Sequence, residues 1–536
     1  MKNKLFLTFV AVISIVGLYL RFIQINQIDS LYPDVAINGL EALYSPIQPF
    51  YFRFGEHNEG LYIVLLKGFF AVFGSGVWQV YGLSALIGSA TVTLFIWIIT
   101  KLKDKTTGII AGIILATSPW HIALSRSGFR SILVPFILGL IYLLFQSYWS
   151  NKTVLKAAVI GVLLGLGFYT YPAYRAIAIF MPFILMAWWL FSKQRASIRI
   201  KHLSIMILAG LITLIPTILM FIAFPEPLAS RVSEVSVFTH KTIMEGFILA
   251  AKQAGKVITG YFFVGDQNWR VNYGQAPLIQ PIVSLGFIAG LGLIAKNISF
   301  ATRSQKIFNT LVLLNLAIFL IPAVFTFEGG QSMPHNMRLS GQLLTVFGIT
   351  AVGINYLFSL IKKLNQSITN YANLFLIVAL LASLFIYSHS LVRASLIKEE
   401  YAKAIRSDLR YVANYLILSD SSHQKIAHVS EFERFTLNYL LKDTENMGIK
   451  PGIRAEYLEQ KTLYDAIHAD YPIVADYNVE YLALNTGDEV VVPVYSDQPD
   501  SYVISYLKNK YPALKSYPYY ADNRFPNKIA FWIYSL

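Results

Sequence analysis

The sequence predicts a mainly α-helical, polytopic membrane protein that carries a C-terminal α/β domain. Three observations predict this fold class. Of the 536 residues, 55% are hydrophobic and only 14% are charged. Apolar stretches of about 18 residues or more, the length that a helix needs to cross a bilayer, recur along residues 1–391. After residue 392 the long stretches end, and short apolar runs alternate with charged segments.

About eleven transmembrane helices are expected. The first follows Lys2 and Lys4 like a signal peptide, but no small-residue cleavage pattern comes after it, so we expect an uncleaved anchor. The segment Leu61–Phe73 is apolar but too short to span, and it is expected to lie at the membrane interface or to re-enter. The expected spans are 5–24, 78–100, 107–119, 131–149, 154–170, 174–191, 203–224, 278–295, 307–326, 338–360 and 371–391.

The loops between these spans fall into two sets by charge. One set holds 16 basic residues and a single acid, Asp104, whereas the loops of the other set are close to charge-balanced. By the positive-inside rule the basic loops are cytoplasmic, which places the N-terminus inside and the C-terminal domain outside the cytoplasmic membrane. The basic residues are Lys2, Lys4, Lys101, Lys103, Lys105, Lys152, Lys156, Lys193, Arg195, Arg199, Lys201, Lys296, Arg303, Lys306, Lys362 and Lys363.

The formal net charge of +14 is therefore mostly a topology signal. Because the basic residues are spread over separate short loops and not along one face, nucleic acid is not an expected partner. The chain has no cysteine, which excludes disulfides and thiolate metal sites.

Residues 392–536 have a different composition from residues 1–391. They carry 19 acidic and 16 basic residues, and their apolar runs are short. Strands that alternate with amphipathic helices predict a small extracytoplasmic α/β domain. The expected strands are 425–430, 471–477, 489–496 and 528–536, and the expected helices are 399–418, 433–443 and 501–510.

The most informative segment is the second outward loop, which places His121, Arg126 and Arg130 between two apolar stretches. Charged groups at the edge of a bilayer are costly and are rarely incidental. If the segment is helical, the two arginines lie on one face, and a guanidinium can hold phosphate oxygens through two parallel hydrogen bonds. This pattern favours a phosphate-binding rim. The alternative is a pair of arginines that snorkel from a helix end.

The first outward loop, residues 25–77, contributes carboxylates. Its segment YPDVAINGLEALY predicts an amphipathic helix that begins near Asp34. A carboxylate at this position suits a general base that removes a proton from an acceptor hydroxyl or amine. The alternative for Asp34 is an N-terminal helix cap.

Three further outward turns are rich in polar side chains. The first is typical of an aromatic belt at the interface, and the second could equally be a solvated turn. The third brings a histidine and an arginine to the mouth of a span. The turns contain, in chain order, Tyr169–Arg175, then Asp266, Asn268 and Arg270, and then His335 and Arg338.

Five loops thus offer arginine, histidine, carboxylate and amide groups to one surface. An acid beside several cations at a lipid interface fits group transfer from a lipid phosphate. We expect four arginines to hold the donor phosphate and to stabilise its charge as it leaves: Arg126, Arg130, Arg270 and Arg338. Contacts to the sugar or the acceptor are expected from Glu59, His121, Asp266, Asn268 and His335.

No cofactor is implied with certainty. A divalent cation is possible, because Asp34, Glu56, Glu59 and Asp266 could share one through oxygen ligands. No spacing in the chain is a metal signature, and the zinc motif HExxH is absent.

At these residues the chain resembles the GT-C membrane glycosyltransferases, in particular the bacterial relatives of protein O-mannosyltransferases and of the lipid A aminoarabinose transferase. The resemblance covers roughly residues 1–390. The segments that carry it, in order, are PDVAINGLEAL, EGLYIVLLKGFFAVFG, SPWHIALSRSGFR, GLGFYTYPAYR, GDQNWRVNY and PHNMRLSG.

The resemblance implies a glycosyltransferase, hexosyl or pentosyl, that uses a polyprenyl-phosphate-linked sugar as donor. It implies transfer on the outer face of the membrane to a lipid, a cell-envelope glycan or a protein, with membrane lipids around the spans. Asp34 matches the first-loop acid that these families use for catalysis. The chain has Asp34-Val35 where the O-mannosyltransferases carry an Asp-Glu pair, which argues against protein O-mannosylation.

Two other functions fit parts of the sequence. A transporter or flippase of lipid-linked saccharide would carry charged groups near the midplane of broken helices, often in repeated halves. Here the charges lie at one rim, and no repeat is visible. A catalytically silent scaffold that binds partners through residues 392–536 does not account for the carboxylates and arginines of the outward loops.

Overall fold

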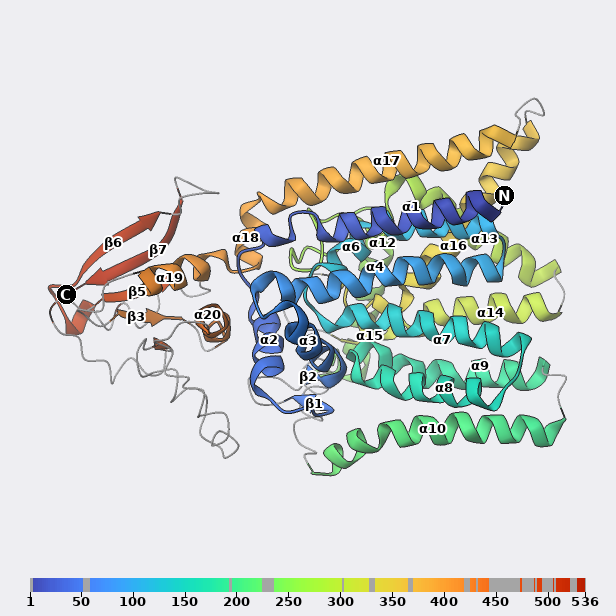
Figure 1. Cartoon of the computed structure of the whole chain (residues 1–536), viewed down its shortest axis with the longest axis horizontal. Helices are drawn as coiled ribbons and strands as arrows, with labels where there is room; N and C mark the ends of the chain where they lie inside the picture. Colours follow the sequence, from blue (N-terminus) through green and yellow to red (C-terminus); the bar gives the residue numbers. More distant parts are fainter. Residues whose placement is uncertain are drawn as a thin grey trace.

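The structure is a computed structural model of the chain. Figure 1 shows a bundle of long helices with a smaller region of helices and strands at one end of it. The structure describes residues 3–51, 58–191, 195–223, 236–300, 303–326, 333–364, 370–418, 425–429, 432–442, 473–474, 486, 489–493, 505, 508–520 and 528–535.

Each of the eleven expected spans falls on a helix of the bundle. Within the described residues, seven helices are long and apolar enough to cross a membrane, and a bent pair makes an eighth. The other three expected spans fall on shorter apolar helices. The prediction of a polytopic, mainly α-helical membrane protein is confirmed. The helices are α1 (Asn3–Phe22), α4 (Val77–Leu102), α5 (Lys105–Thr117), α7 (Leu133–Ser150), α8 (Val154–Leu166), α9 (Ile177–Phe191), α10 (Ala196–Ala223), α13 (Pro281–Phe300), α14 (Arg303–Ile318), α16 (Leu343–Leu364) and α17 (Asn370–Leu396).

Glycines allow some of these helices to approach closely. A Cβ atom at Gly161 in α8 would lie 2.2 Å from the carbonyl oxygen of Met206 in α10. One at Gly353 in α16 would lie 1.8 Å from the carbonyl oxygen of Gly286 in α13. Small residues are typical of helix contacts in membranes, because lipid removes the hydrophobic drive and leaves close packing to hold the helices together.

The third expected span is bent. α5 ends at Thr117, and α6 (Pro119–Ser125) continues at an angle of 59°. Pro119 has no N–H group, so the helical hydrogen bonds are interrupted there. The Ser118 hydroxyl begins the new helix by accepting from the backbone N–H of His121 at 3.3 Å. The carbonyl groups at the end of α5 therefore need donors from elsewhere.

Buried side chains supply those donors. Arg21, near the end of α1, donates through Nη2 and Nη1 to the carbonyl oxygens of residues 115 and 116, at 3.2 and 3.1 Å. The Gln280 amide and the Ser388 hydroxyl donate to the carbonyl oxygen of Thr117, at 3.0 and 2.5 Å. Side chains from three other segments thus hold the bend, and α6 leads directly into residues 126–130.

Short elements gather at the end of the bundle that lies next to the smaller region (Figure 1). They are α2 (Pro33–Tyr44), the antiparallel pair β1 (Phe50–Tyr51) and β2 (Asn58–Glu59), and α3 (Gly60–Phe73). The helix expected near Asp34 is confirmed as α2. α3 has 14 residues, fewer than a helix needs to cross a membrane, as expected. We call this end of the bundle the α2 end, and the opposite end, where α4 meets α5, the basic end.

The sequence did not predict α12 (Ile243–Phe262), which lies inside the expected loop 225–277. A capping box begins this helix: the Thr242 hydroxyl accepts from the N–H of Glu245, and the Glu245 carboxylate accepts from the N–H of Thr242. The charged residues of α12 keep its hydropathy below that of a transmembrane helix, so hydropathy alone does not reveal this helix. A short α15 (Ile321–Val324) follows α14.

The C-terminal region is a small α/β unit, as predicted. Its described helices are α18 (Glu399–Ala404), α19 (Ser407–Leu418) and α20 (Arg434–Leu441). The five-stranded sheet has the order β4-β3-β5-β7-β6, parallel among β4, β3 and β5 and antiparallel at β7 and β6. The strands are β3 (Lys425–His428), β4 (Ile473–Val474), β5 (Glu489–Pro493), β6 (Lys515–Tyr520) and β7 (Ile529–Ser535).

Three details of this region differ from the expectation. The helix expected at 399–418 is broken into α18 and α19 at Arg406, whose φ of 59° is left-handed. β6 was not predicted, and most of the helix expected at 501–510 lies outside the described residues. The expected boundary at residue 392 falls inside α17, which continues to Leu396.

The C-terminal region docks on the α2 end. The Thr436 hydroxyl of α20 donates to the carbonyl oxygen of Leu31 at 2.9 Å, and the Tyr439 hydroxyl donates to that of Ser75 at 2.7 Å. The Tyr439 ring lies so close to Gly39 of α2 that a Cβ there would be 2.3 Å from it. α20 is therefore fitted against α2, on the side where the polar loops gather.

Candidate active site

The first predicted site residue, Asp34, lies in the first turn of α2 and forms an ion pair. Its Oδ2 accepts a hydrogen bond from Nη1 of Arg270 at 3.5 Å. The side chain of Asp34 is 30% exposed and that of Arg270 is 14% exposed, so the pair is accessible from one side. The N-cap of α2 is Tyr32, which makes no side-chain cap bond. Asp34 is therefore not the N-cap residue of α2, which was the alternative.

Arg270 is held in place from several directions. Its Nε donates to Oδ1 of Asn268 at 2.9 Å, and its guanidinium carbon lies 3.8 Å above the ring of Tyr32 and 6.0 Å from that of Phe129. Aromatic faces attract cations and restrict their motion. The guanidinium is thus fixed between loop one, loop two and its own loop, which confirms that these three loops meet.

Asp266 fastens the Arg270 loop to the loop before α16. One carboxylate oxygen accepts from the backbone N–H of Asn268 at 2.9 Å, and the other accepts from that of Asn336 at 2.8 Å. Asp266 is almost fully buried. Trp120 of α6 donates to the carbonyl oxygen of Asn336 at 3.2 Å and ties the same loop to the bent span. Asp266 and Asn268 therefore shape the site from inside the protein.

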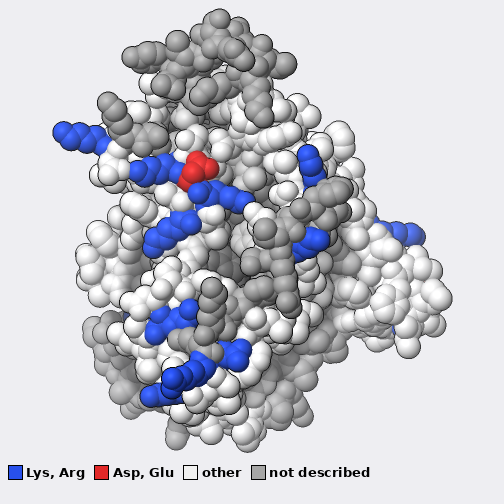
Figure 2. Space-filling view, turned by 90° about the vertical axis from the view of Figure 1, so that its right-hand side faces the viewer, with Lys and Arg blue, Asp and Glu red and all other residues white. Residues whose placement is uncertain are grey.

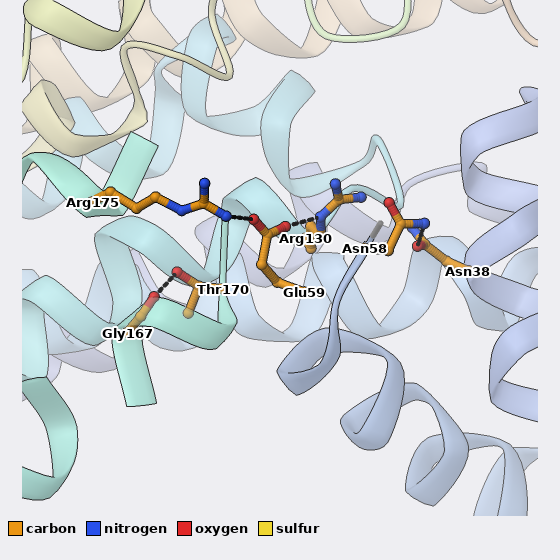
Figure 3. A network of polar contacts seen from close by, with 7 residues as sticks. All are labelled: Asn38, Asn58, Glu59, Arg130, Gly167, Thr170 and Arg175. Atoms are coloured by element: carbon orange, nitrogen blue, oxygen red, sulfur yellow. Dashed lines mark hydrogen bonds and ion pairs between the residues drawn. The ribbon is translucent and has the colours of Figure 1, made fainter. Parts of the chain in front are cut away.

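A second cluster is built on Glu59, at the end of β2 (Figure 3). Its two carboxylate oxygens accept from Nε of Arg130 at 2.8 Å and from Nη2 of Arg175 at 3.0 Å. The Glu59 side chain is 1% exposed, Arg130 is 12% exposed and Arg175 is 38% exposed. One buried carboxylate thus aligns two cations, and the guanidinium of Arg175 is the part most open to a ligand.

Sequence reasoning did not select Arg175, since YTYPAYR is typical of an interfacial aromatic belt. The signal was present in one feature: an arginine that follows three tyrosines at the mouth of a span is unlike a plain aromatic belt. The structure also pairs Arg130 with this turn, because its guanidinium lies 5.7 Å from the ring of Tyr171.

Asn38 and Asn58 connect the two clusters. Asn38 lies one turn after Asp34 on α2, and its Oδ1 accepts from Nδ2 of Asn58 at 3.3 Å. Asn58 precedes Glu59 on β2, so the contact in Figure 3 sets the Asp34 helix against the strand that carries Glu59, the partner of both arginines. The Asp34–Arg270 pair and the Glu59 cluster are therefore linked through two elements that touch, α2 and β2, at the α2 end.

The two arginines of loop two do not share a face. The segment after α6 is not helical, and Gly128, with φ of +68°, makes a left-handed turn between the two arginines. Arg126 is 2% exposed and donates through Nη1 to the carbonyl oxygens of Arg21 and Ile23, at 2.9 and 2.7 Å. It therefore caps the end of α1, whereas only Arg130 reaches the surface cluster.

His121 also lies away from the rim. It is fully buried in α6, and its Nδ1 lies 2.6 Å from Nη2 of Arg21. Because a guanidinium can only donate, Nδ1 accepts, which assigns the ring proton to Nε2. His121 thus belongs to the buried group that holds the bend between α5 and α6.

His335 and Arg338 lie beside the first cluster. Burial, together with the neighbouring cations Arg338 and Arg270, holds the pKa of His335 well below its usual range. Its imidazole is therefore neutral at physiological pH. Arg338 donates through Nη1 to Oγ1 of Thr326 at 2.8 Å and is mostly buried. The fifth loop thus reaches the same surface, as expected.

The candidate cation ligands are separated by their own partners. Asp34 and Glu59 each pair with arginine, and Asp266 accepts backbone donors. Glu56 lies outside the described residues. Among the residues that the structure describes, no three of His, Asp and Glu lie close enough together to hold a metal ion. A divalent cation at this site remains a prediction from the sequence.

The arrangement has two chemical capacities. A partly exposed carboxylate held by a cation can accept a proton from a nucleophile. Guanidinium groups aligned by a buried acid can bind and stabilise phosphate oxygens. The two capacities lie on one surface, which is what group transfer from a phosphate donor requires.

Residues 61–220 match a family model described as dolichyl-phosphate-mannose-protein mannosyltransferase. No curated protein sequence matches the chain significantly.

Solved structures of membrane glycosyltransferases are similar to this chain. ArnT from Cupriavidus metallidurans in the apo state has a TM-score of 0.54 at 11% identity, over 99% of this chain and 97% of that one. The same protein bound to undecaprenyl phosphate has a TM-score of 0.52, at the same identity and coverage. The Archaeoglobus fulgidus oligosaccharyltransferase in the apo form has a TM-score of 0.51 at 12% identity, over 92% of this chain and 70% of that one. The resemblance stated from the sequence is confirmed at the level of the fold.

Proposed function

We propose that this chain, which has the fold of the GT-C membrane glycosyltransferases, transfers a glycosyl group from a polyprenyl-phosphate-linked sugar to an acceptor on the outer face of the cytoplasmic membrane. The acceptor is a lipid, a cell-envelope glycan or a protein. The proposal draws on the matched family and on ArnT, whose structure was solved with undecaprenyl phosphate. The observation that carries it is the Asp34–Arg270 pair beside the Glu59-aligned arginines.

Asp34 is the proposed general base. Its Oδ2 takes the proton from the hydroxyl or amine of the acceptor as that atom forms a bond to the anomeric carbon of the sugar. The bond from the anomeric carbon to the donor phosphate breaks at the same time, and its electron pair leaves with the polyprenyl phosphate. Arg270, at 3.5 Å from Oδ2, holds the carboxylate in place beside the donor site.

The arginines are proposed to bind the donor phosphate. The leaving polyprenyl phosphate gains negative charge, so cations that contact it lower the barrier. Arg175 and Arg130 suit this task, because Glu59 fixes their orientation and leaves part of each guanidinium accessible. Arg270, 14% exposed, adds to the cationic surface, whereas Arg338 and His335, which is neutral at physiological pH, lie buried behind it. For Arg126 and His121 we propose a structural role, since both are buried in the bend.

The orientation of the protein in the membrane is part of the proposal. The positive-inside rule assigns the loops that hold 16 basic residues and a single acid to the cytoplasmic side, and the basic end with them. The α2 end and the C-terminal region that covers it then face outward. Because α20 packs on α2, which carries Asp34, residues 392–536 are in a position to influence the choice of acceptor.

The test is a donor-consumption assay. The purified full chain is incubated with a panel of labelled polyprenyl-phosphate sugars and with candidate acceptors. We expect Asp34→Asn to lower turnover by roughly 100-fold or more while donor-lipid binding persists, because the change removes a proton acceptor and little volume.

Asp104→Asn at the basic end is the matched control. Asp104 caps α5, and asparagine caps a helix as well as aspartate does, so turnover should be unchanged. Near wild-type turnover of Asp34→Asn with a donor that the wild type consumes would rule out Asp34 as the base. A protein that moves lipid-linked sugar across vesicles without consuming it would support the transporter alternative.

A further inference from the structure

The basic end contains a large cavity that the proposed reaction does not use. Its volume is about 940 Å³, and helices α4, α7, α9, α13, α14 and α16 line it. Most of the wall is apolar, with side chains such as Phe95, Phe145 and Leu344. A cavity of this size and character takes a ligand with a large apolar part.

Polar atoms in the cavity wall lack partners. Asn309 and Trp188 are more than nine-tenths buried, and both line the cavity. Neither Nδ2 of Asn309 nor Nε1 of Trp188 has a hydrogen-bond partner among the residues that the structure describes, and the same holds for Oε1 of Gln146. Two of these three atoms are donors. These atoms are closed to solvent in the structure, so an occupant that brings acceptor oxygens would reach the two donors only after the side chains rotate.

Two lysines lie at the mouth of the cavity. Lys101 and Lys103, at the end of α4, both belong to the lining and are exposed. Lys103 lies over the ring of Phe308, which also lines the cavity, with its Nζ 5.9 Å from the ring centre. Figure 2 views the molecule from this end and shows Lys and Arg spread over the face, with little acidic surface among the described atoms. The mouth of the cavity is therefore cationic.

The cavity is remote from the candidate active site. α4 runs from the α2 end to Lys101, and its 26 residues span about 39 Å. A lipid whose phosphate lies at Lys101 and Lys103 cannot at the same time present that phosphate to Arg175 or Arg270. A lipid whose phosphate lies at Lys101 and Lys103 is thus a different molecule from a donor whose phosphate lies at the arginines of the candidate active site.

We infer that the cavity binds one anionic glycerophospholipid from the leaflet at the basic end. Its phosphate lies between Lys101 and Lys103, and an acyl chain fills the apolar interior. Charge selects the class of lipid: basic pockets between membrane helices on the cytoplasmic side are suited to anionic head groups.

The experiment measures lipid binding by native mass spectrometry of the delipidated full chain in detergent. Phosphatidylglycerol and phosphatidylcholine with identical acyl chains are added in turn. We expect at least a tenfold preference for phosphatidylglycerol. The double substitution Lys101→Gln and Lys103→Gln should weaken its binding roughly 20-fold.

The matched control is the double substitution Lys105→Gln and Lys201→Gln, which removes two basic residues of the same end that do not line the cavity. This control should bind phosphatidylglycerol like the wild type. Equal binding of the two lipids, or equal losses in the two double variants, would overturn the assignment of the head group.

A cavity-filling substitution tests whether the acyl chain of the lipid lies in the cavity. Gly348 lines the cavity, and a Cβ added there meets Ile99 at 3.4 Å, an ordinary contact, so a larger side chain points into space. Gly348→Leu should abolish high-affinity phosphatidylglycerol binding, and Gly348→Val should weaken it, with an unchanged melting temperature as the check that each variant folds. Unchanged binding in a folded variant would overturn the proposal. So would a polyprenyl phosphate that displaces phosphatidylglycerol from the wild type and is itself excluded by Gly348→Leu.

Discussion

The two ends of the helix bundle use charge in opposite ways. At the α2 end, the described acids and arginines of the site are paired and partly or fully buried, as in Glu59 with Arg130 and Arg175. At the basic end, lysines such as Lys101 and Lys201 are exposed, and the acid Asp104 caps a helix. Surface charges of the second kind cost little and direct topology, whereas buried pairs need exact partners. In this membrane protein, pairing and burial distinguish the end for which we propose the reaction better than the number of charges does.

The orientation of the protein in the membrane tests the comparison of the two ends, and the test has only two outcomes. The chain has no cysteine, so single cysteines can be placed at will. Ile47→Cys, at a position 70% exposed at the α2 end, should react with an impermeant thiol reagent added outside intact cells. Ser197→Cys, exposed at the basic end, should react only after permeabilisation. Labelling in the reverse order would remove the outer-face reaction.

Breaking the buried pair should have the largest effect on stability. Glu59→Gln leaves two partly buried guanidinium groups without a counter-charge, at a cost of about 3 kcal/mol. We expect a clear fall in melting temperature and at least a tenfold loss of donor turnover. Lys201→Gln at the basic end should change stability by less than about 0.5 kcal/mol.

A second substitution tests whether charge is the cause. In Glu59→Gln with Arg175→Gln, one of the unpaired cations is gone, so part of the lost stability should return even though turnover does not. A double variant less stable than Glu59→Gln alone would show that Arg175 stabilises the fold through other contacts.

Two glycines compare the ends at the level of the backbone. Gly128 needs its left-handed φ of +68°, and a Cβ there would lie 2.7 Å from Cγ1 of Val35, the neighbour of Asp34. Gly128→Ala should cost about 2 kcal/mol and lower turnover through a displaced α2. Gly292, in α13, has no atom within 4 Å of an added Cβ. Gly292→Ala should therefore be neutral or slightly stabilising, as thermal unfolding of both variants would show.

The smallest expected effect is on pH dependence. The pKa of His335 is depressed in the folded protein, so below about pH 6.5 the unfolded chain takes up a proton that the folded chain does not. The contribution of His335 to the free energy of unfolding is thus fully present above that pH and is lost as the solution becomes more acidic. In His335→Gln the melting temperature should fall less between pH 7 and pH 5 than in the wild type. Identical slopes would mean that His335 is protonated in the fold.

The sequence predicted the spans and the convergence of the loops, but only part of the site. Hydropathy and loop charge are local properties, so each expected span falls on a helix. The direction of a side chain is not local. Arg126 and Arg130 read alike in sequence, yet the turn at Gly128 sends one to the carbonyl groups of α1 and the other to Glu59.

The sequence did not reveal the roles of two other arginines, because their partners lie far away in the chain. Arg175 depends on Glu59, 116 positions earlier, and no periodicity connects them. Arg21 looks like a flanking charge of the first span, but its partners are carbonyl groups of α5. In both cases the tertiary fold, and not the surrounding residues, decides whether an arginine serves the site, the scaffold or the membrane surface.

The buried position of Arg21 has a consequence for biogenesis. α1 is synthesised and inserted roughly a hundred residues before the bent segment whose carbonyl groups and histidine ring accept from Arg21. Until that segment enters the membrane, the guanidinium has none of these acceptors and must remain near the headgroups. We therefore expect the Arg21 end of α1 to take up its buried position only when the α5–α6 pair arrives. A generic signal anchor in its place would insert, but it would leave the carbonyl oxygens of residues 115 and 116 without the donors that Arg21 supplies.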